Sequence, residues 1–344
     1  MKKAPTKKST PAHGELATAT APPRIKRILV TTDFSAESLA GLRYAAALAD
    51  RLKAHLAVLN VVEPPSRFAG VDTVILARPD TKVAALARAQ LATVAQHEQI
   101  GTSKITPSVR IGKPFHEIIT AAYEDTADLI VIATHGRTGV EHALLGSTAE
   151  RVVRHSPCPV LTVPARVPAK GKAKASPATP GVKKILVPVD FSNLSKEALP
   201  YAVLLAEKYQ AELVLIHVVE EFPIDYLLGR ELMGETAMPL LKQAESDLAR
   251  LSTNLEAATG VKTSVLVRDG KPFQEICAAA KSAGADLIVL TTHGYTGLKH
   301  WWLGSTAERV VRHAACPVLI VREMEHEFIA VPARSKPAPR TKVK

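Results

Sequence analysis

The chain contains few cysteines and no long hydrophobic segment, and both absences narrow the class of protein. Its 344 residues include three cysteines, Cys158, Cys277 and Cys316, which form neither a CxxC pair nor an even-numbered disulfide framework. We therefore expect a reducing, cytoplasmic environment, with Cys158 and Cys316 as small buried apolar residues. No apolar run approaches about 18 residues, and the lysine-rich N-terminus leads into no apolar segment. The sequence thus predicts neither a membrane span nor secretion.

Several binding signatures are missing as well. Neither Gly-x4-Gly-Lys-Ser/Thr nor Gly-x-Gly-x2-Gly occurs, so the chain has no P-loop and no dinucleotide-binding fingerprint. Four histidines recur at matching positions, but no further protein ligand accompanies them, and we expect no metal site; they are His135, His142, His293 and His300.

Acidic residues are outnumbered by basic ones, 33 to 44, but the distribution of the basic residues argues against a nucleic-acid groove. The net charge is +11, of which residues 1–24 carry +4, residues 164–182 carry +4 and residues 330–344 carry +5, so the rest of the chain is close to neutral. These segments are rich in Pro, Ala and Lys and cannot build a core. We expect a disordered basic arm (1–24), a linker (164–182) and a basic tail (323–344). Weak, salt-sensitive binding of nucleic acid by them is a minor alternative.

The chain is an internal duplication. Between residues 133–163 and residues 291–321, 22 of 31 positions are identical without a gap. Near Asp190 the offset between the copies is one residue smaller, which places an insertion between Asp190 and Gly270. The sequence therefore predicts two domains, 25–163 and 183–322, each large enough to bury its own core.

Each half alternates short apolar runs with amphipathic segments, which is typical of a parallel sheet with right-handed helical crossovers. In the first half we expect strands at 26–33, 55–62, 105–111, 128–133 and 158–163, with helices at 35–53, 81–99, from Pro114 and at 147–155. The second half repeats this order. Pro200 falls inside its first helix and should kink or delay it.

A glycine loop lies between the fourth strand and the last helix of each half. It contains Gly136, Gly139 and Gly146 in the first copy. Ser147, with Glu150 three residues later, resembles a capping box that starts the helix, as does Ser305 in the second copy. Free amides and the positive end of the helix dipole would favour an anion, most plausibly phosphate. Capping and tight turning alone would also explain these residues.

Three separated motifs occur twice in the same order: Ile-Leu-Val-x-x-Asp-Phe-Ser, Gly-Lys-Pro-Phe-x-Glu-Ile, and the glycine loop through Ala-Glu-Arg-Val-Val-Arg-His-x-x-Cys-Pro-Val-Leu. In these motifs the chain resembles the universal stress protein family in a tandem form. The resemblance implies an α/β fold with two Rossmann-like (adenine nucleotide alpha hydrolase-like) domains. Each would have a five-stranded parallel sheet of order 3-2-1-4-5 with helices on both faces, and a crevice where the first and fourth strands end.

The resemblance also implies a ligand, ATP, with or without Mg²⁺. In nucleotide-binding members the loop reads Gly-x2-Gly-x9-Gly-Ser/Thr and holds the phosphates and ribose, while an aspartate and a valine hold the adenine. Here the first glycine is replaced by Ala133 in one half and Thr291 in the other. The residues predicted to bind nucleotide are Thr32, Asp33, Val61, Ala133, His135, Gly136, Arg137, Gly139, Gly146, Ser147 and Thr148 in the first half, and Val189, Asp190, Val218, Gly294, Gly297, Gly304, Ser305 and Thr306 in the second.

Binding is expected to be stronger in the first half. Thr291 is β-branched where Ala133 is small, and Arg137 can pair with phosphate where Tyr295 cannot.

Two functions follow from these features. The first is an ATP-binding regulatory protein of the stress response. Slow ATP hydrolysis is left open, although the sequence offers no evident base or water-positioning residue for it. The alternative is an interaction protein that binds no nucleotide. In either case the family's mode of dimerisation predicts that the last strands of the two halves pair within one chain as a pseudo-dimer. A further homodimer and an unidentified protein partner are left open.

Overall fold

The computed structural model describes residues 23–63, 82–97, 105–134, 145–164, 181–220, 230–292 and 304–322. The first half contains β1 (Arg27–Thr31), α1 (Ala36–Leu52), β2 (His55–Val62), α3 (Lys82–His97), β3 (Ile105–Ile111), α4 (Pro114–Glu124), β4 (Leu129–Ala133), α5 (Ser147–His155) and β5 (Val160–Val163). The second half contains β6 (Lys184–Pro188), α6 (Asn193–Lys196), α7 (Ala198–Tyr209), β7 (Glu212–Val219), α9 (Arg230–Thr259), β8 (Thr263–Asp269), α10 (Pro272–Ala283), β9 (Leu287–Thr291), α11 (Ser305–His313) and β10 (Val318–Val321).

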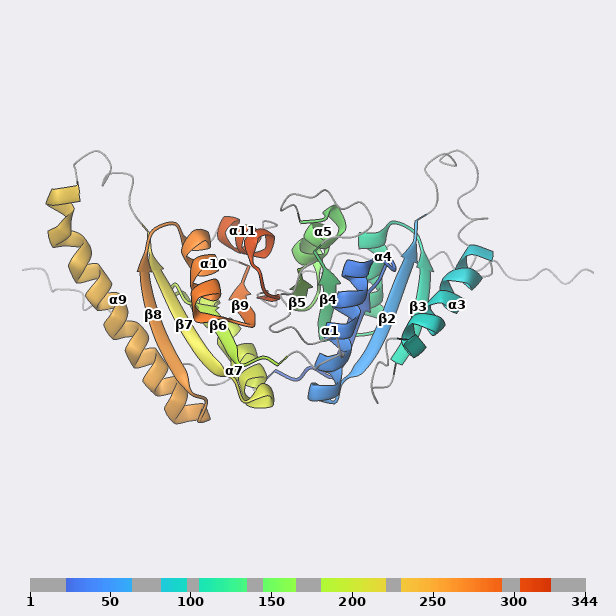
Figure 1. Ribbon diagram of the computed structural model, residues 1–344, viewed down its shortest axis with the longest axis horizontal. Coiled ribbons are helices and arrows are strands. Elements are labelled where there is room, and N and C mark those ends of the chain that lie inside the picture. The colour runs from blue at the N-terminus through green and yellow to red at the C-terminus, as the bar shows by residue number, and fades with distance from the viewer. Residues whose placement is uncertain are drawn as a thin grey trace, which may run out of the picture.

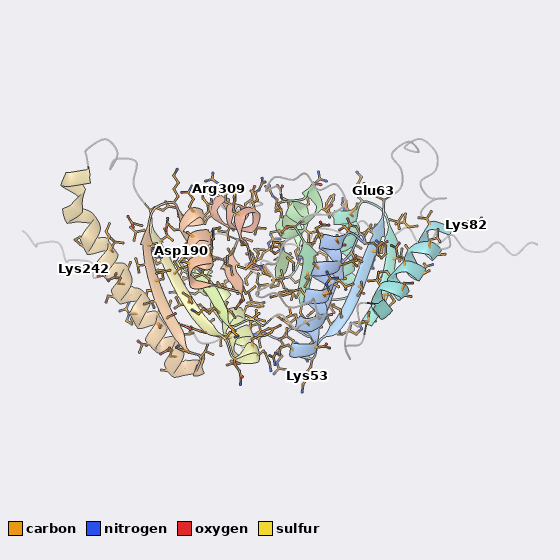
Figure 2. All side chains as sticks on the ribbon, in the orientation of Figure 1. Lys53, Glu63, Lys82, Asp190, Lys242 and Arg309 are labelled. Atoms are coloured by element: carbon orange, nitrogen blue, oxygen red, sulfur yellow. The ribbon has the colours of Figure 1, made fainter. Side chains whose placement is uncertain are left out.

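The two halves share one ten-stranded sheet of order β3-β2-β1-β4-β5-β10-β9-β6-β7-β8. Within each half the strands are parallel and follow the order 3-2-1-4-5, as predicted. At the centre β5 and β10 run antiparallel, with Leu161 opposite Leu319 and Thr162 opposite Val318. The predicted pseudo-dimer is therefore confirmed, and Figure 1 shows its halves side by side with α3 and α9 at opposite ends. Lys82 and Lys242 mark these two ends in Figure 2.

Helices cover both faces of the sheet. One buried cluster contains Leu42, Leu91, Leu205 and Leu248, so α1, α3, α7 and α9 lie on one face. The other cluster draws buried residues from α4, α5, α10 and α11 on the opposite face. Strand residues alternate between the two clusters, because successive side chains in a strand point to opposite faces. The strands read as continuous apolar runs for this reason.

Local sequence sets most of the helix boundaries. The side chain of Ser35 accepts a hydrogen bond from the amide of Ser38 and so caps α1, as the sequence predicts. Ser192 caps α6 in the same way. Pro114 stands in the first turn of α4, where its missing N–H costs nothing. In the second half the expected single helix is divided into α6 and α7, because the ring of Pro200 clashes with a carbonyl one turn earlier.

Three details of the sequence prediction are wrong. The first strand ends at Thr31, two residues before the predicted end at Asp33, because the tight turn begins there. The N-cap residues of α5 and α11 are Gly146 and Gly304, so the serines that follow are the first helical residues and make no capping box. The last strands begin at Val160 and Val318, two residues later than predicted. Each is preceded by a proline, which lacks the N–H that a strand residue donates; Pro159 instead accepts from the amide of Ile130.

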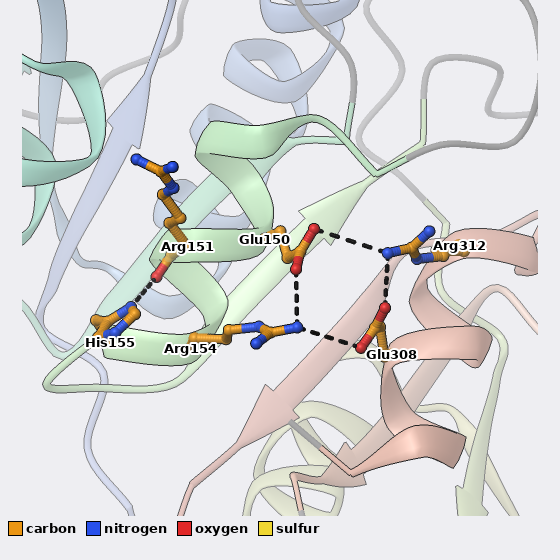
Figure 3. Close-up of polar contacts among 6 residues, drawn as sticks. All are labelled: Glu150, Arg151, Arg154, His155, Glu308 and Arg312. Carbon is orange, nitrogen blue, oxygen red and sulfur yellow. Dashed lines mark hydrogen bonds and ion pairs between the residues drawn. The ribbon is translucent and has the colours of Figure 1, made fainter. Parts of the chain in front are cut away.

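A ring of charged residues joins the halves beside the central strands. Arg154 contacts Glu150 at 2.8 Å and Glu308 at 3.5 Å, and Arg312 contacts Glu308 at 2.6 Å and Glu150 at 3.7 Å. Figure 3 shows that the four side chains come from α5 and α11 and alternate in sign around the ring. Because each arginine bridges both carboxylates, the ring fixes the two helices relative to one another.

Further contacts join the halves outside this ring. The guanidinium of Arg51 in α1 lies over the ring of Tyr209 in α7, 5.1 Å from its centre. Burial raises the pKa of Tyr209 to about 12, and the charge of Arg51 opposes that shift. Nη1 of Arg322 donates to the carbonyl of Ser156 at 2.9 Å, which ties the end of β10 to the end of α5.

We expect Leu319→Ala to weaken the whole pseudo-dimer. Leu319 is 1% exposed and pairs with Leu161 at the centre of the sheet, so truncation leaves a cavity and should lower the free energy of unfolding by about 2–5 kcal/mol. Urea denaturation measures the change. Val83→Ala is the control, because Val83 is 54% exposed and should change stability by under about 0.5 kcal/mol. Equal effects of the two substitutions would contradict the central role of this strand pair.

Candidate functional site

The sheet brings together two segments about a hundred residues apart in sequence. Strands β1 and β4 are neighbours, with Val30 opposite Val131. Asp33 and Thr134 each lie three residues beyond that pair and therefore follow the same edge of the sheet. Val61 lies two residues beyond Leu59, which pairs with Thr31. In the second half Asp190 and Val218 follow Pro188 and Ile216 in the same way. The predicted crevice thus has its expected framework.

A tight turn fixes the acidic residue of each crevice. Oδ1 of Asp33 accepts from the amide of Ser35 at 3.0 Å and from its hydroxyl at 2.6 Å. Oδ1 of Asp190 accepts from the amide of Ser192 at 3.0 Å. The intervening Phe34 and Phe191 have φ of 65° and 61°, a left-handed conformation that is rare for bulky residues. Backbone strain of this kind persists where the surrounding structure requires it and is frequent at functional sites.

The hydroxyl group of Thr32 stabilises this turn through hydrogen bonds. Thr32 is 4% exposed, and its Oγ1 lies 3.0 Å from Oγ of Ser38 and accepts from the amide of Phe34 at 3.0 Å. Its counterpart Val189 is also buried and carries no hydroxyl. Of the predicted ligand-binding residues, these two therefore shape the crevice through the backbone.

Two side chains that the sequence analysis missed support the turns. Nδ2 of Asn60 donates to the carbonyl of Thr32 at 2.8 Å, and Nδ1 of His217 donates to the carbonyl of Val189 at 2.7 Å. The residues occupy equivalent positions in β2 and β7, and the hydrogen bond of His217 places a proton on Nδ1. A polar residue inside a run of buried apolar ones was the signal available in the sequence.

The ends of each glycine loop are joined directly. The amide of Gly146 donates to the carbonyl of Thr134 at 2.8 Å, and the amide of Gly304 donates to that of Thr292 at 2.7 Å. A Cβ at residue 146 would lie 3.1 Å from the Thr134 oxygen, so this close approach favours glycine. The predicted residues His135, Gly136, Arg137, Gly139, Gly294 and Gly297 lie within the loops, outside the described residues.

The N-cap residue of the helix that follows each loop is a glycine and so offers no capping side chain. These N-cap residues are Gly146 for α5 and Gly304 for α11. The first two helical residues are Ser147 and Thr148 in the first half, and Ser305 and Thr306 in the second. The first amides of a helix point away from it, and the helix dipole places partial positive charge there. This geometry suits an anion.

Ala133, which replaces the first glycine of the family pattern, lies against a helix. It is 8% exposed, and a Cβ built on Gly41 of α1 would lie 3.7 Å from the Ala133 methyl group. In the second half Thr291 is partly exposed, and Ala198 stands where the first half has Gly41. A methyl group on residue 41 would therefore make only ordinary van der Waals contact with Ala133, and the second half has larger residues at both positions.

We also searched the described ranges for a metal site and for a membrane-spanning helix. Within them no three His, Cys, Asp or Glu side chains are grouped so as to hold a metal ion. No helix among the described residues is long and apolar enough to cross a membrane. The histidines at positions 135, 142, 293 and 300 lie outside these ranges.

Comparison with known proteins identifies the class. The model of the universal stress protein family matches residues 24–164 and 181–322, so the chain belongs to that family and carries two of its domains. The universal stress protein MJ0531 of Methanocaldococcus jannaschii is 38% identical over 145 residues, which are 42% of this chain and 85% of that protein. YxiE of Bacillus subtilis is 35% identical over 145 residues, covering 40% of this chain and 98% of YxiE.

A solved structure matches both halves together. A universal stress protein from Archaeoglobus fulgidus aligns with 86% of this chain and 98% of its own, with a TM-score of 0.63 and 25% sequence identity. The first two relatives thus correspond to one half of this chain, whereas the tandem arrangement has a counterpart among solved structures.

Gly146→Ala should destabilise the protein by about 1 kcal/mol, because alanine is a poor N-cap and its Cβ would crowd the Thr134 carbonyl. Thermal unfolding measures the effect. Gly181→Ala is the matched control, since a Cβ there meets nothing within 4 Å. If the two variants have the same melting temperature, the contact between the loop ends contributes nothing to stability.

The cysteines should react slowly in the native protein. Burial raises the pKa of Cys277 to about 11 and that of Cys158 to about 12, although Ser156 opposes the shift at Cys158. A thiol with a pKa near 11 is about 0.1% ionised at pH 8. We therefore expect iodoacetamide to label the native chain far more slowly than the urea-unfolded chain, with mass spectrometry as the readout. Rapid native labelling of Cys158 would contradict this expectation.

Proposed function

We propose that this universal stress protein binds an adenine nucleotide in the crevice of its first half. The observation that carries the proposal is the joined pair of Thr134 and Gly146, which presents the glycine-capped start of α5 at the edge of the sheet where Asp33 is held. The amide of Gly146 is engaged with the Thr134 carbonyl, so Ser147 and Thr148 would receive phosphate oxygens on their amides, with the loop residues before Gly146. The charge of Mg²⁺ would offset that of the phosphates.

The opposite wall of the crevice suits a purine. Asp33 offers a carboxylate acceptor to an exocyclic amine, and its orientation is set in advance by the two hydrogen bonds from Ser35. Val61 is partly exposed at the end of β2 and can contact the flat face of a base. Because the support residues Thr32 and Asn60 hold this turn in place, little ordering should accompany binding.

The proposed role is regulatory rather than enzymatic. The acidic residue in the first turn of α5, Glu150, is paired with Arg154 and Arg312 in the charged ring and so is not placed as a general base. Occupancy of the loop would instead change the surface that the protein presents to a partner.

A second candidate function is that of an interaction protein without nucleotide, and the second half supplies the observation in its favour. Val189, His217 and Thr291 replace Thr32, Asn60 and Ala133 around its crevice, so its lining differs in polarity and size. We propose that the second half is mainly a structural and interaction module.

The test compares matched aspartates by calorimetry with Mg²⁺ and ATP. Asp33→Asn keeps an Oδ1 acceptor for the Ser35 amide but replaces the second carboxylate oxygen with a donor. We expect it to lower ATP affinity at least about tenfold, since a hydrogen bond to a charged group contributes roughly 1.5–3 kcal/mol. Asp190→Asn should leave the measured affinity unchanged. No heat of binding by the wild-type protein at millimolar ATP would rule out the nucleotide proposal and favour the interaction module.

A further inference from the structure

The outer edges of the ten-stranded sheet are β3 and β8. In β8 the carbonyl of Lys262 accepts from Leu213 of β7, so alternate residues from this position turn their backbone groups toward β7. Thr263, Val265, Val267 and Asp269 therefore direct their N–H and C=O groups away from the sheet. The same alternation holds in β3, whose register with β2 matches that of β8 with β7.

The two edges differ at their centre. Pro107 pairs with Val58 in the first half, and Val265 pairs with Leu215 at the equivalent position in the second. Proline has no N–H to donate, and an outward-facing proline is a common protection against edge-to-edge association. The edge formed by β3 is thus blocked at the position where β8 carries a donor.

The middle of the β8 edge is open. Val265 is 40% exposed. At the start of the strand the amide of Thr263 donates to Oε1 of Glu256 at 2.6 Å, so α9 covers that end. For the outward amides of Val265 and Val267, no acceptor is found in the described part of the chain.

We propose that β8 pairs antiparallel with β8 of a second copy of this chain. The register centred on Leu266 sets Val265 opposite Val267 of the second copy and Leu266 opposite its own counterpart, so the outward-facing Val265 and Val267 form the new hydrogen bonds. It also sets Arg268 opposite Ser264, so no like charges face each other. The strand is therefore complementary to itself.

The length of α9 also favours a second copy of this chain as the partner of β8. Its 30 residues span about 45 Å, whereas the seven residues of β8 span roughly 23 Å. Figure 1 shows α9 extending past the carboxyl end of β8. In an antiparallel pair this extension would lie beside the second copy's α9. Leu240, in the amino-terminal half of α9, is 53% exposed and available for that contact.

A second copy fits better than an unrelated extended peptide for two reasons. The same domain already associates by antiparallel strand pairing at β5 and β10. Pro107 blocks the opposite edge, so pairing through β8 closes after two copies and does not propagate into fibres.

Sedimentation velocity from about 1 to about 200 µM protein tests the proposal. We expect the wild-type chain to form a dimer as concentration rises. Val265→Pro should fold, because the equivalent strand already carries proline, and should raise the dissociation constant at least about tenfold through the lost donors. Pro107→Val, the mirror substitution, should leave the β8 dimer in place.

Hydrogen exchange on the wild-type chain gives a readout that does not depend on a variant. The outward amides of Val265 and Val267 should gain protection between low and high concentration, while that of Val109, the equivalent of Val267 in β3, should not. The proposal is overturned if the wild-type chain stays monomeric throughout the range, if Val265→Pro dimerises as the wild type does, or if the protection appears on Val109 instead.

Discussion

The antiparallel pairing of β5 with β10 determines how the rest of the molecule is arranged. A five-stranded parallel sheet of order 3-2-1-4-5 has two edges, and here the fifth strand of each half is covered on both faces: all four residues of β5 are buried, as are all four of β10. Joining the two edges removes both from water and satisfies their backbone groups. It also makes each half a neighbour of the other's last helix, so the starts of α5 and α11 are set by one common interface.

The charged ring beside this interface acts on orientation more than on stability. Its side chains are 23–28% exposed, so water screens their attraction, and pairs of this kind contribute little each. Their geometry is restrictive, however, because Arg154 and Arg312 must each reach two carboxylates on different helices. A shift of α5 relative to α11 would break the cross-half contacts. The glycine loops end directly before these helices, so the ring holds the backbone on which any phosphate would rest.

The sequence predicted the architecture well and the details of the site less well. Apolar runs, helix caps and the order of motifs placed β2 and β3 at their observed residues, and Pro200 marked the break between α6 and α7. The caps at Gly146 and Gly304 were missed, because the pattern of serine and glutamate suits a capping box one residue later than the backbone allows. The support by Asn60 and His217 was missed for a different reason. Each donates to a carbonyl 28 residues earlier, and only the fold brings the two positions together.

Duplication explains why the residues that line the two crevices differ while those of the central interface are alike. The residues of the central interface must fit their counterparts, and the segment from Gly146 to His155 is repeated unchanged from Gly304 to His313. The hydrogen bonds described for the turn after the first strand, from Ser35 and Asn60 in one copy and from Ser192 and His217 in the other, each lie within one half, so this turn is less constrained. There Thr32 with Asn60 became Val189 with His217, yet both pairs leave a side-chain donor on the same carbonyl and the same left-handed phenylalanine. The backbone of the turn is thus maintained by two different side chains, while the surface offered to a ligand is free to change.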